Sequence, residues 1–485
     1  MNQILAVDQG TSGTKALLLS ESGEIIGRGY QDFQLIHGQN GLVEVDAHVL
    51  WTSILSAVDQ LKLGDAPIAM GLANQGESVL VWDRKTGEPL SPVMVWQDSR
   101  AASLCDERRE FESLVKARTG LTLDPYFIAP KMKFLRDRYS DGVITTTDTW
   151  IIYRLTGKYV TDHGTASRSL IYDLHANQWS KELLGIWNLV REELPEIYCN
   201  DGVVAPINAP ELPQLHGTLL AGINVDQPAA LFAQSCFKPG EAKCTYGTGA
   251  FLLANIGDQP KISHNGLVTS VAWFLKSEKA YYFDGQVFTA ASAITWLIEN
   301  GLLDSSEQID SLPSDTGGVI AVPGFAGYGS PRWQPEGTAS ITGISLGTTK
   351  AHIARAVVDG IAAQVSELLD ALAADGVLIS RLRADGGLSQ SHTLMQTQSN
   401  LSQIPIDVYP HPDATALGIA GFTRLALDSS LSPNEAIPKW QAHESYTPSI
   451  SSESAKEFMK RWQADRKSTR LNSSHTDISR MPSSA

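Results

Sequence analysis

The chain has 485 residues, of which 42% are hydrophobic and 19% charged, and its net charge is −15 at pH 7. That length is too great for a single hydrophobic core and fits two domains of roughly 230 residues each. Because the acidic balance comes without a cluster of lysines and arginines, the composition argues against nucleic acid or an anionic membrane as the main partner.

The first predicted element is a tight β-hairpin over Ile4–Leu19, in which two apolar runs flank a Gly/Thr/Ser turn. Gly10 and Gly13 let this turn aim backbone N–H groups at one anionic oxygen. Asp8, at the strand end, could hold a magnesium ion directly or through water. Hydroxyls and a cation surround the tip: Thr11, Ser12, Thr14 and Lys15. The implied ligand is a nucleotide polyphosphate with its metal, an ordinary solvated hairpin being the alternative; no Walker A sequence is present.

A helix and a buried strand follow. Asp46 precedes the apolar series Val49, Leu50, Ile54 and Val58, which predicts a capped helix with its apolar side in the core. Residues 68–74 form a predicted buried strand with a polar end. Ligands collect at the carboxyl ends of strands in open α/β sheets, so the residues after it, Gln75 and Glu77, are pocket candidates.

Two aromatic residues follow, one at the end of a strand and one in a turn. Trp96 ends the apolar run that begins at Val93, and either stacks on an apolar face of a ligand or belongs to the core. Tyr126 lies in a Pro-containing turn, where its hydroxyl either points into the pocket or fastens the loop. The later segment 161–167 is predicted to be a polar loop, to which we assign no chemistry.

Asp226 and Gln227 stand at the start of a predicted helix, with Pro228 in its first turn. Aspartate is a favoured N-cap, which is the purely structural interpretation of Asp226. The functional interpretation is a general base that takes the proton from a substrate hydroxyl as that hydroxyl attacks a phosphoryl group.

The hairpin pattern recurs at Cys244–Gly257, where a strand, a Gly-Thr-Gly turn centred on Thr248 and a second apolar strand follow one another. Two such hairpins, one in each half of a chain, resemble the arrangement of actin-like, sugar-kinase and Hsp70-type ATPases. Further on, Phe283–Trp296 is predicted to be a small-residue helix near the nucleotide. A strand over 379–385 then enters a Gly-rich turn at Gly387, where the backbone can approach a purine or its phosphates.

We predict an N-terminal domain over residues 1–234, a C-terminal domain over 235–465 and a tail over 466–485. The tail shows no helical or strand period from about Lys467 and resembles translated vector or adaptor sequence, with a native disordered tail as the alternative.

The cysteines indicate the compartment. None lies in a C-x-x-C pair or near a histidine at metal-ligand spacing, which predicts free buried thiols in a reducing cytoplasm. No signal peptide precedes Asp8, and no apolar run approaches the roughly 20 residues that span a bilayer. We therefore expect a cytoplasmic protein, for which a homo-oligomeric state stays open.

Taken in order, these stretches resemble the FGGY carbohydrate kinases, and within that family most closely the glycerol kinases. The resemblance extends over nearly the whole chain, from about residue 3 to about residue 465. It rests on these ordered motifs: Asp8-Gln-Gly-Thr11, Asn74-Gln75-x-Glu77, Val95-Trp96-Gln97, Asp124-Pro-Tyr-Phe127, Asp148-Thr-Trp150, Asp226-Gln227, Thr245-Tyr-Gly-Thr-Gly249 and Asp385-Gly-Gly387.

The resemblance implies an α/β fold of two actin-like (ribonuclease H-like) ATPase domains around a central cleft, with ATP between the domains. It makes Asp226 the catalytic base and places Asp8 beside Mg²⁺. The polyol or sugar site would comprise Gly76, Glu77, Trp96, Tyr126, Asp226, Gln227 and Phe251. The nucleotide site would comprise Thr11, Ser12, Gly13, Lys15, Thr248, Ala291, Thr295, Gly387 and Ser391.

Two positions depart from the family pattern. Glycerol kinases carry an arginine where this chain has Gly76, and that arginine helps to hold the substrate hydroxyls. Loss of a charge-assisted hydrogen bond costs on the order of 1.5–3 kcal/mol, roughly 10- to 100-fold in affinity. Ala291 stands where glycerol kinases have glycine near the nucleotide, which is a milder change.

The leading hypothesis is an ATP-dependent polyol or sugar kinase, with glycerol, converted to glycerol 3-phosphate, as the first acceptor to consider. Because Gly76 opens volume in the pocket, a larger polyol or ketose such as erythritol or xylulose is the alternative. From other classes, the fold could serve as an actin-like ATPase scaffold that phosphorylates nothing, or as a regulatory binding protein with a decayed site. Asp226 and the two phosphate hairpins speak against both.

Overall fold

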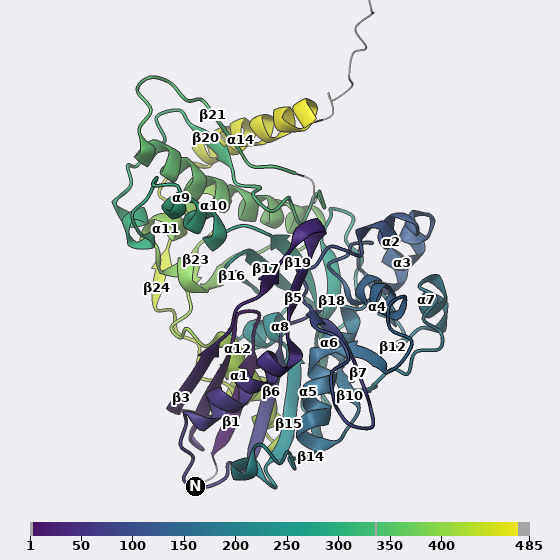
Figure 1. The fold of residues 1–485 in the computed structure, drawn as a ribbon. Helices are drawn as coiled ribbons and strands as arrows, with labels where there is room; N and C mark the ends of the chain where they lie inside the picture. Colours follow the sequence, from purple (N-terminus) through teal and green to yellow (C-terminus); the bar gives the residue numbers. More distant parts are fainter. Residues whose placement is uncertain (1–2, 335–336, 474–485) are drawn as a thin grey trace, which may run out of the picture.

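The computed structural model describes residues 3–334 and 337–473, which form two lobes, each built around a mixed β-sheet (Figure 1). The first sheet has the order β14-β15-β6-β1-β2-β3, and the second has the order β18-β19-β17-β16-β22-β23-β24. The strands of the first sheet are β1 (Ile4–Gln9), β2 (Gly13–Leu19), β3 (Ile25–Asp32), β6 (Ala69–Asn74), β14 (Val203–Pro206) and β15 (Leu219–Val225). Those of the second are β16 (Ala242–Tyr246), β17 (Ala250–Gly257), β18 (Val268–Phe274), β19 (Lys279–Val287), β22 (Leu382–Asp385), β23 (Ile406–Val408) and β24 (Glu444–Tyr446).

Both predicted hairpins are present, and the strands around them pair alike. β1 pairs antiparallel with β2 and parallel with β6, while β16 pairs antiparallel with β17 and parallel with β22. Each tip is closed by a backbone hydrogen bond of 2.9 Å, from the Gly10 N–H to the Gly13 carbonyl and from the Gly247 N–H to the Gly249 carbonyl. The chain thus repeats one supersecondary unit in its two lobes, as the sequence predicts.

Helices cover both faces of the first sheet, and β1 shows how its sequence allows this. Leu5 and Val7 belong to the core shared with α1 (Ala47–Asp59), whereas Ala6 belongs to the core shared with α12 (Ala414–Leu427). This alternation is what a strand buried on both faces requires, because successive side chains point to opposite sides.

A glycine in α12 sets the position of α8 (Asp226–Ala233), the helix that begins at the predicted base. A Cβ built on Gly418 would lie 1.9 Å from the Ala229 carbonyl oxygen, so only glycine allows the two helices to approach this closely. A helix from late in the chain therefore completes the first lobe.

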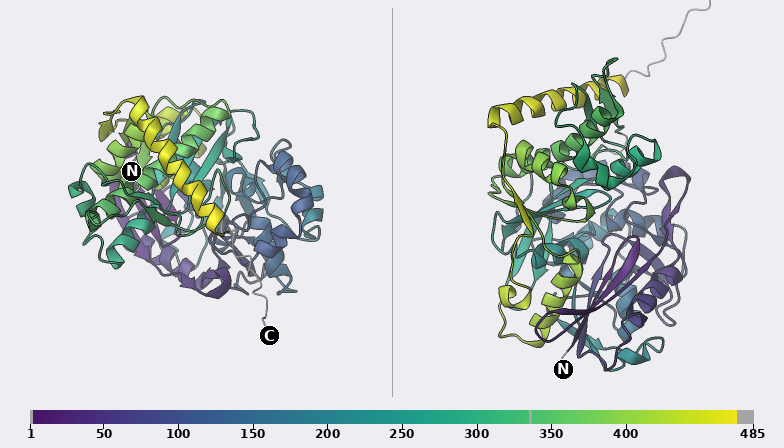
Figure 2. Two further views of the ribbon diagram at one scale, coloured as in Figure 1. Left: turned by 90° about the horizontal axis from the view of Figure 1, so that it is seen from above. Right: turned by 90° about the vertical axis from the view of Figure 1, so that its left-hand side faces the viewer.

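Helices also cover the sheet of the second lobe. The buried Trp462 indole N–H donates to the Ala321 carbonyl at 2.9 Å and so fastens the last helix, α14, across the end of this lobe (Figure 2). The helices of this lobe are α9 (Ala291–Glu299), α10 (Lys350–Ala374), α11 (His392–Ser402) and α14 (Ser452–Ser473), with the short strands β20 (Ile320–Val322) and β21 (Ser340–Thr342).

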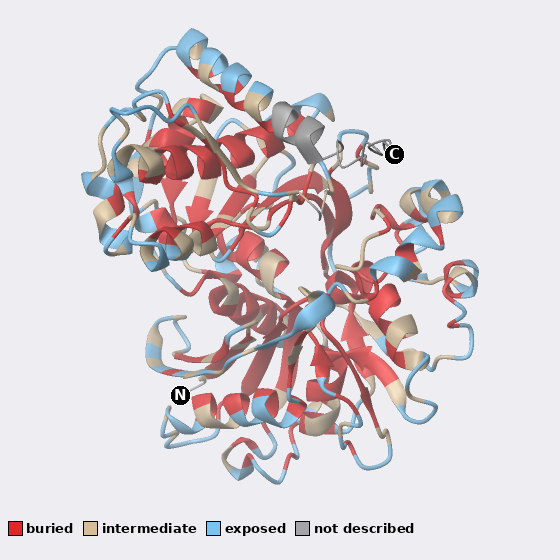
Figure 3. Ribbon diagram, turned by 45° about the horizontal axis from the view of Figure 1, so that its top comes forward, coloured by how far each residue is buried: buried red, intermediate tan, exposed pale blue. Residues whose placement is uncertain are grey.

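A further group of elements flanks the first lobe and has a core of its own (Figure 3). It carries the loop with Tyr126. The helices that contribute to this core are α2 (Ala102–Asp106), α3 (Glu112–Thr119), α4 (Ile128–Arg136) and α7 (Lys181–Ile186). A five-stranded sheet of order β4-β5-β8-β7-β9 also contributes to it, with the strands β4 (Ile36–His37), β5 (Val43–Val45), β7 (Val79–Trp82), β8 (Val93–Met94) and β9 (Val143–Thr146). Other short helices pack in the cores of the two lobes: α5 (Thr147–Thr156), α6 (His163–Ser167) and α13 (Pro433–Ala436). Two strand pairs complete the structure, β10 (Val160–Asp162) with β13 (Glu196–Tyr198) and β11 (Tyr172–Asp173) with β12 (Gln178–Trp179).

The structure corrects several local predictions. Val49 is 43% exposed, because it lies beyond the edge of the apolar side of α1. The segment 161–167 is a strand end followed by α6, because the Asp162 carboxylate caps the helix by accepting from the Thr165 N–H. Residues 283–287 belong to β19 and not to a helix, since they pair along β17 and leave only α9 helical.

The predicted tail differs in part as well. Arg466 is buried against Glu367, and α14 continues to Ser473, so residues 467–473 are helical. The remainder of the segment, 474–485, lies outside the described residues. The boundary at residue 234 and the non-native origin of the tail stay predictions. Within the described part of the chain, no helix combines the length and the apolar character that a membrane crossing needs.

We predict that Gly418→Ala destabilises the protein by roughly 1–3 kcal/mol, because the added methyl group meets the Ala229 carbonyl. It should also lower kcat, since Asp226 begins the displaced helix. Gly185→Ala is the matched control: Gly185 also lies in a helix, but no atom lies within 4 Å of its added Cβ. Thermal unfolding of the two variants is the measurement. Equal melting temperatures would contradict the predicted contact.

Candidate active site

The parallel pairing of three strands brings the predicted site residues to one edge of the first sheet. Gln9, Asn74 and Val225 stand side by side in the register of β1, β6 and β15. Asp8, Glu77 and Asp226 lie at or just beyond these strand ends, where ligands collect in α/β sheets.

A cavity of about 610 Å³ opens between the lobes at this edge, within the size range of small-molecule sites. Its lining brings together many of the predicted residues: Thr11, Ser12, Gly76, Glu77, Trp96, Tyr126, Asp226, Gln227, Thr248 and Phe251. The other predicted residues lie outside its lining: Asp8, Gly13, Lys15, Ala291, Thr295, Gly387 and Ser391. The acceptor residues and both hairpin tips thus face one space, which the nucleoside residues do not line.

Asp226 occupies the first position of α8, after the N-cap Val225. Its Oδ1 accepts a hydrogen bond of 2.7 Å from the Gln227 backbone N–H. Burial and the charge of Asp8 raise the pKa of Asp226 to about 6, while Lys243 acts in the opposite direction. A carboxylate with such a pKa is ionised at neutral pH and is a stronger base than an exposed aspartate.

Burial, together with Asp413, also raises the pKa of Asp8 to about 6, against the influence of Lys15. Lys15 stands opposite Asp8 in the hairpin register, but its Nζ lies 2.8 Å from an Asp413 oxygen. Nothing in the described residues groups three metal-ligating side chains. Mg²⁺ is commonly held by one or two carboxylates together with substrate phosphates, so Asp8 with Asp226 nearby fits such an ion.

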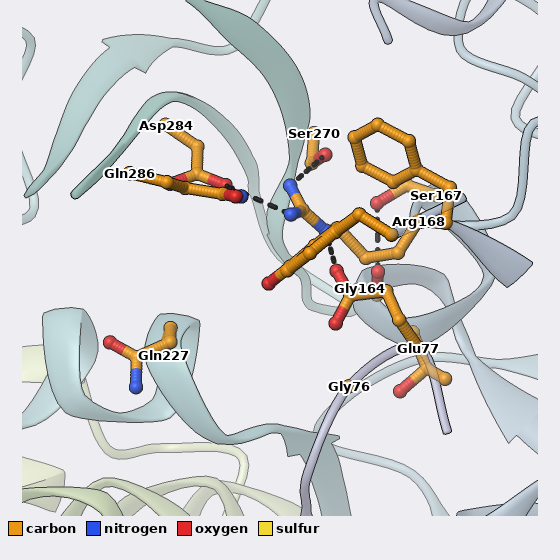
Figure 4. Close-up of polar contacts among 12 residues, drawn as sticks. Gly76, Glu77, Gly164, Ser167, Arg168, Gln227, Ser270, Asp284 and Gln286 are labelled. Atoms are coloured by element: carbon orange, nitrogen blue, oxygen red, sulfur yellow. Dashed lines mark hydrogen bonds and ion pairs between the residues drawn. The ribbon is translucent and has the colours of Figure 1, made fainter. Parts of the chain in front are cut away.

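Arg168 lies between Glu77 and Asp284, as Figure 4 shows. Its Nε donates to Glu77 Oε1, and its Nη2 lies 2.9 Å from Asp284 Oδ2 on β19. Its Nη1 donates to Ser270 Oγ at 3.0 Å. Glu77 is buried and adopts a left-handed backbone conformation with φ of 56°, a strained arrangement typical of functional sites. The guanidinium thus joins carboxylates of both lobes at the wall of the cavity.

Three aromatic rings form another wall. The Trp96 ring centroid lies 5.6 Å from that of Tyr126 and 6.0 Å from that of Phe251. The Trp96 indole N–H donates to Thr11 Oγ1 at 2.9 Å, which links this wall to the first hairpin. Lys131, fully buried, donates to the carbonyls of residues 125–127 and holds the Tyr126 loop; burial lowers its pKa to about 8.

The predicted nucleoside residues lie in the second lobe. The Ala291 N–H donates to the Gly247 carbonyl at 2.9 Å, which fixes the start of α9 to the second hairpin. Ser391 caps α11 and donates to Asp310 Oδ1 at 2.7 Å. Gly387 has open space around its missing side chain, as a close ligand approach requires.

Sequence analysis missed three charged residues of the site. Arg168 follows the segment assigned no chemistry, Asp284 lies in the segment predicted as helix, and Lys243 precedes the second hairpin motif. Lys243 is buried and its Nζ donates to Thr245 Oγ1 at 2.6 Å and to Gln227 Oε1. The aromatic run Ala280-Tyr-Tyr-Phe283 was a signal that could have indicated a strand over this segment, although not the role of Asp284.

Comparison with known proteins identifies the family. The N-terminal domain of the FGGY family of carbohydrate kinases matches residues 3–233, and the C-terminal domain of that family matches residues 242–427. A glycerol kinase of Thermus brockianus is 40% identical, with 92% of this chain and 94% of that protein covered. A glycerol kinase of Janthinobacterium sp. (strain Marseille) is 37% identical, with 95% and 97% covered.

Solved structures agree. Plasmodium falciparum glycerol kinase with ADP matches with a TM-score of 0.89 at 30% identity, covering 97% of this chain and 98% of that one. Xylulose kinase of Lactobacillus acidophilus matches with a TM-score of 0.88 at 22% identity, covering 97% and 99%, which shows a shared fold alone. The family resemblance and the two-domain actin-like fold predicted from the motifs are confirmed. The chain belongs to the FGGY family of ATP-dependent carbohydrate kinases.

Proposed function

We propose that this protein transfers the γ-phosphoryl group of ATP to a hydroxyl of a small polyol or sugar, with glycerol as the first acceptor to test. The observation that carries the proposal is the shared cavity, which joins Asp226, Glu77 and Tyr126 to the tips of both hairpins. Relatives named glycerol kinase at 37–40% identity support glycerol. The related structure with ADP supports an adenine nucleotide.

Asp226 accepts the proton of the acceptor hydroxyl as that oxygen attacks phosphorus. Gln227 and Glu77 orient the acceptor, with Trp96 and Phe251 against its carbon chain. The hydroxyls of Thr11, Ser12 and Thr248, with the glycine N–H groups of both hairpins, offer donors to phosphate oxygens from two sides. Bound ATP would supply the phosphoryl group, and Mg²⁺ beside Asp8 would neutralise its charge. An ATPase scaffold or a binding protein with a decayed site would not need a base, acceptor-binding residues and two phosphate hairpins around one cavity.

The acceptor panel is the decisive test of the activity. We expect ATP consumption with Mg²⁺ to depend on an added acceptor when glycerol, erythritol, xylitol, ribitol and xylulose are supplied one at a time. The assay uses the full-length chain, because Arg466, which lies in the predicted tail, is buried in the fold. A rate of ATP hydrolysis that no acceptor changes would contradict the kinase proposal and favour the scaffold.

Asp226→Asn should lower kcat about 10²- to 10⁴-fold with whichever acceptor is active, because proton abstraction is lost. In the wild type, kcat/KM should fall as the pH drops below about 6, since Asp226 must be ionised to accept a proton. Initial rates between pH 5 and 8 measure this, with ATP saturating. A flat profile down to pH 5 would argue against Asp226 as the base.

The same variant should change stability in a pH-dependent way. The pKa of Asp226 is higher in the folded state, about 6, than the ordinary value of 3.8, so the folded protein binds more protons than the unfolded chain between these values. The free energy of unfolding of the wild type therefore decreases as the pH rises through this range. We expect the melting temperature of Asp226→Asn to exceed that of the wild type by more at pH 7.5 than at pH 5.

A larger polyol or ketose is the second candidate acceptor, and Gly76 favours it. Gly76 lines the cavity, and a Cβ built there meets only Val225 Cγ2, at 3.0 Å. The wall is therefore open where glycerol kinases carry an arginine, and longer carbon chains can use that volume.

Restoring the arginine should shift the preference toward glycerol. In Gly76→Arg with Val225→Ala, the second change relieves the 3.0 Å contact, and we expect the KM for glycerol to fall about 10-fold or more relative to acceptors of four or five carbons. Val225→Ala alone is the matched control and should leave the ratio unchanged. If the double variant did not change the ratio of the KM values, Gly76 would not determine which acceptor is preferred.

A further inference from the structure

One carboxylate in the lining of the cavity, that of Asp284, has an oxygen without a hydrogen-bond partner in the described part of the chain. The Asp284 side chain lines the cavity and is 4% exposed. Its Oδ2 receives two contacts, from Arg168 Nη2 at 2.9 Å and from Gln286 Nε2 at 2.7 Å (Figure 4). Its Oδ1 is buried and has no hydrogen-bond partner within the described ranges. The protein thus provides hydrogen-bond donors for one oxygen of this carboxylate and none for the other.

The chemistry of that missing partner is restricted. A carboxylate oxygen only accepts hydrogen bonds, and leaving it buried without a donor is costly. Arg168 already donates to Glu77, Ser270 and Asp284, which fixes Asp284 in place. The donor must therefore enter through the cavity, and a ligand hydroxyl meets both requirements, displacing any water that occupies the position beforehand.

The length of the acceptor follows from the number of groups to be satisfied. Glycerol has three hydroxyls, of which one reacts beside Asp226. Glu77 of the first lobe and Tyr126 of the group of elements that flanks it offer polar atoms to the other two. Asp284 belongs to the second lobe, and Gly76 leaves open space along the same cavity. A hydroxyl for Asp284 Oδ1 thus has to come from a fourth or later carbon.

We propose, resting on the function proposed above, that Asp284 determines acceptor specificity by accepting a hydrogen bond from a hydroxyl beyond the third carbon. The preferred acceptor is then a polyol or ketose of four or five carbons that contacts both lobes. Arg168 acts as a positioning residue, because it holds Glu77 and Asp284 at the spacing that this acceptor spans.

The test compares kcat/KM for glycerol, erythritol, xylitol, ribitol and xylulose in the full-length wild type and in Asp284→Asn. We expect at least one acceptor of four or five carbons to exceed glycerol in the wild type. In the variant its kcat/KM should fall about 10- to 100-fold, mainly through KM, as for the loss of a hydrogen bond to a charged group. The value for glycerol should fall by a smaller factor, because Asp284 also holds Arg168 against Glu77, so the ratio of the longer acceptor to glycerol should decrease.

Asp359→Asn is the matched control, because Asp359 is also a buried aspartate of the second lobe, paired with Arg355 at 2.7 Å, and does not line the cavity. It should lower the melting temperature without changing the ratio between acceptors. If Asp284 had a purely structural role, Asp284→Asn would lower kcat/KM for every acceptor by the same factor and leave the ratio between acceptors unchanged. That outcome would overturn the proposal.

If circular dichroism shows that Asp284→Asn does not fold, the variant Asp284→Glu tests the proposal instead. The longer side chain keeps a carboxylate for Arg168 but extends one methylene further into the cavity, so the preference should shift toward glycerol by about tenfold or more. An unchanged preference overturns the inference. Glycerol as the best acceptor in every variant would refute the role of Asp284 and leave the kinase function standing, whereas ATP consumption that no acceptor alters would refute both.

Discussion

The site depends on one buried ion-pair arrangement, in which the Arg168 guanidinium joins Glu77 of the first lobe to Asp284 of the second. A buried charge is tolerated only when it is paired and hydrogen-bonded, and removing one partner leaves the others uncompensated. Because each partner comes from a different lobe, the pair also sets how the walls of the cavity face each other. In the proposed function, recognition of the acceptor and the arrangement of the lobes would therefore depend on the same side chains.

The second requirement is the register of the first sheet. Three parallel strands end together, which places Asp8, Glu77 and Asp226 close enough for their charges to interact. Burial and a neighbouring negative charge raise the pKa values of Asp8 and Asp226 to about 6. The neighbouring charge is that of Asp413 for Asp8 and that of Asp8 for Asp226. Such crowding of carboxylates costs stability in the empty protein. In the proposed reaction, a magnesium ion and the acceptor hydroxyls would be the partners that relieve it, so the same crowding that destabilises the fold would favour ligand binding.

Much of this arrangement could be predicted from local sequence. The hairpins, the strand before Glu77 and the helix after Asp226 have short-range signals, namely glycine turns, apolar runs and a proline in the first helical turn. Arg168 and Asp284 could not be predicted, because an arginine after a short helix and an aspartate in a strand acquire their meaning only when two lobes meet. The predictions for Val49 and for residues 283–287 were wrong because tertiary contacts, and not the local pattern, decide both. Val49 lies outside the buried side of α1, and residues 283–287 pair with β17 as part of β19.

In the proposed specificity, Gly76 and Asp284 together would change the acceptor of this family fold without changing its chemistry. In the proposed reaction, the base acts on the reacting hydroxyl, which every acceptor presents alike, and the hairpins act on the phosphates of ATP, which are the same for every acceptor. The far end of the acceptor meets a wall that lacks a side chain at Gly76 and offers a free oxygen at Asp284. Since that oxygen belongs to the second lobe, an acceptor that reaches it adds a contact across the cavity, and discrimination by length comes from whether both lobes are engaged.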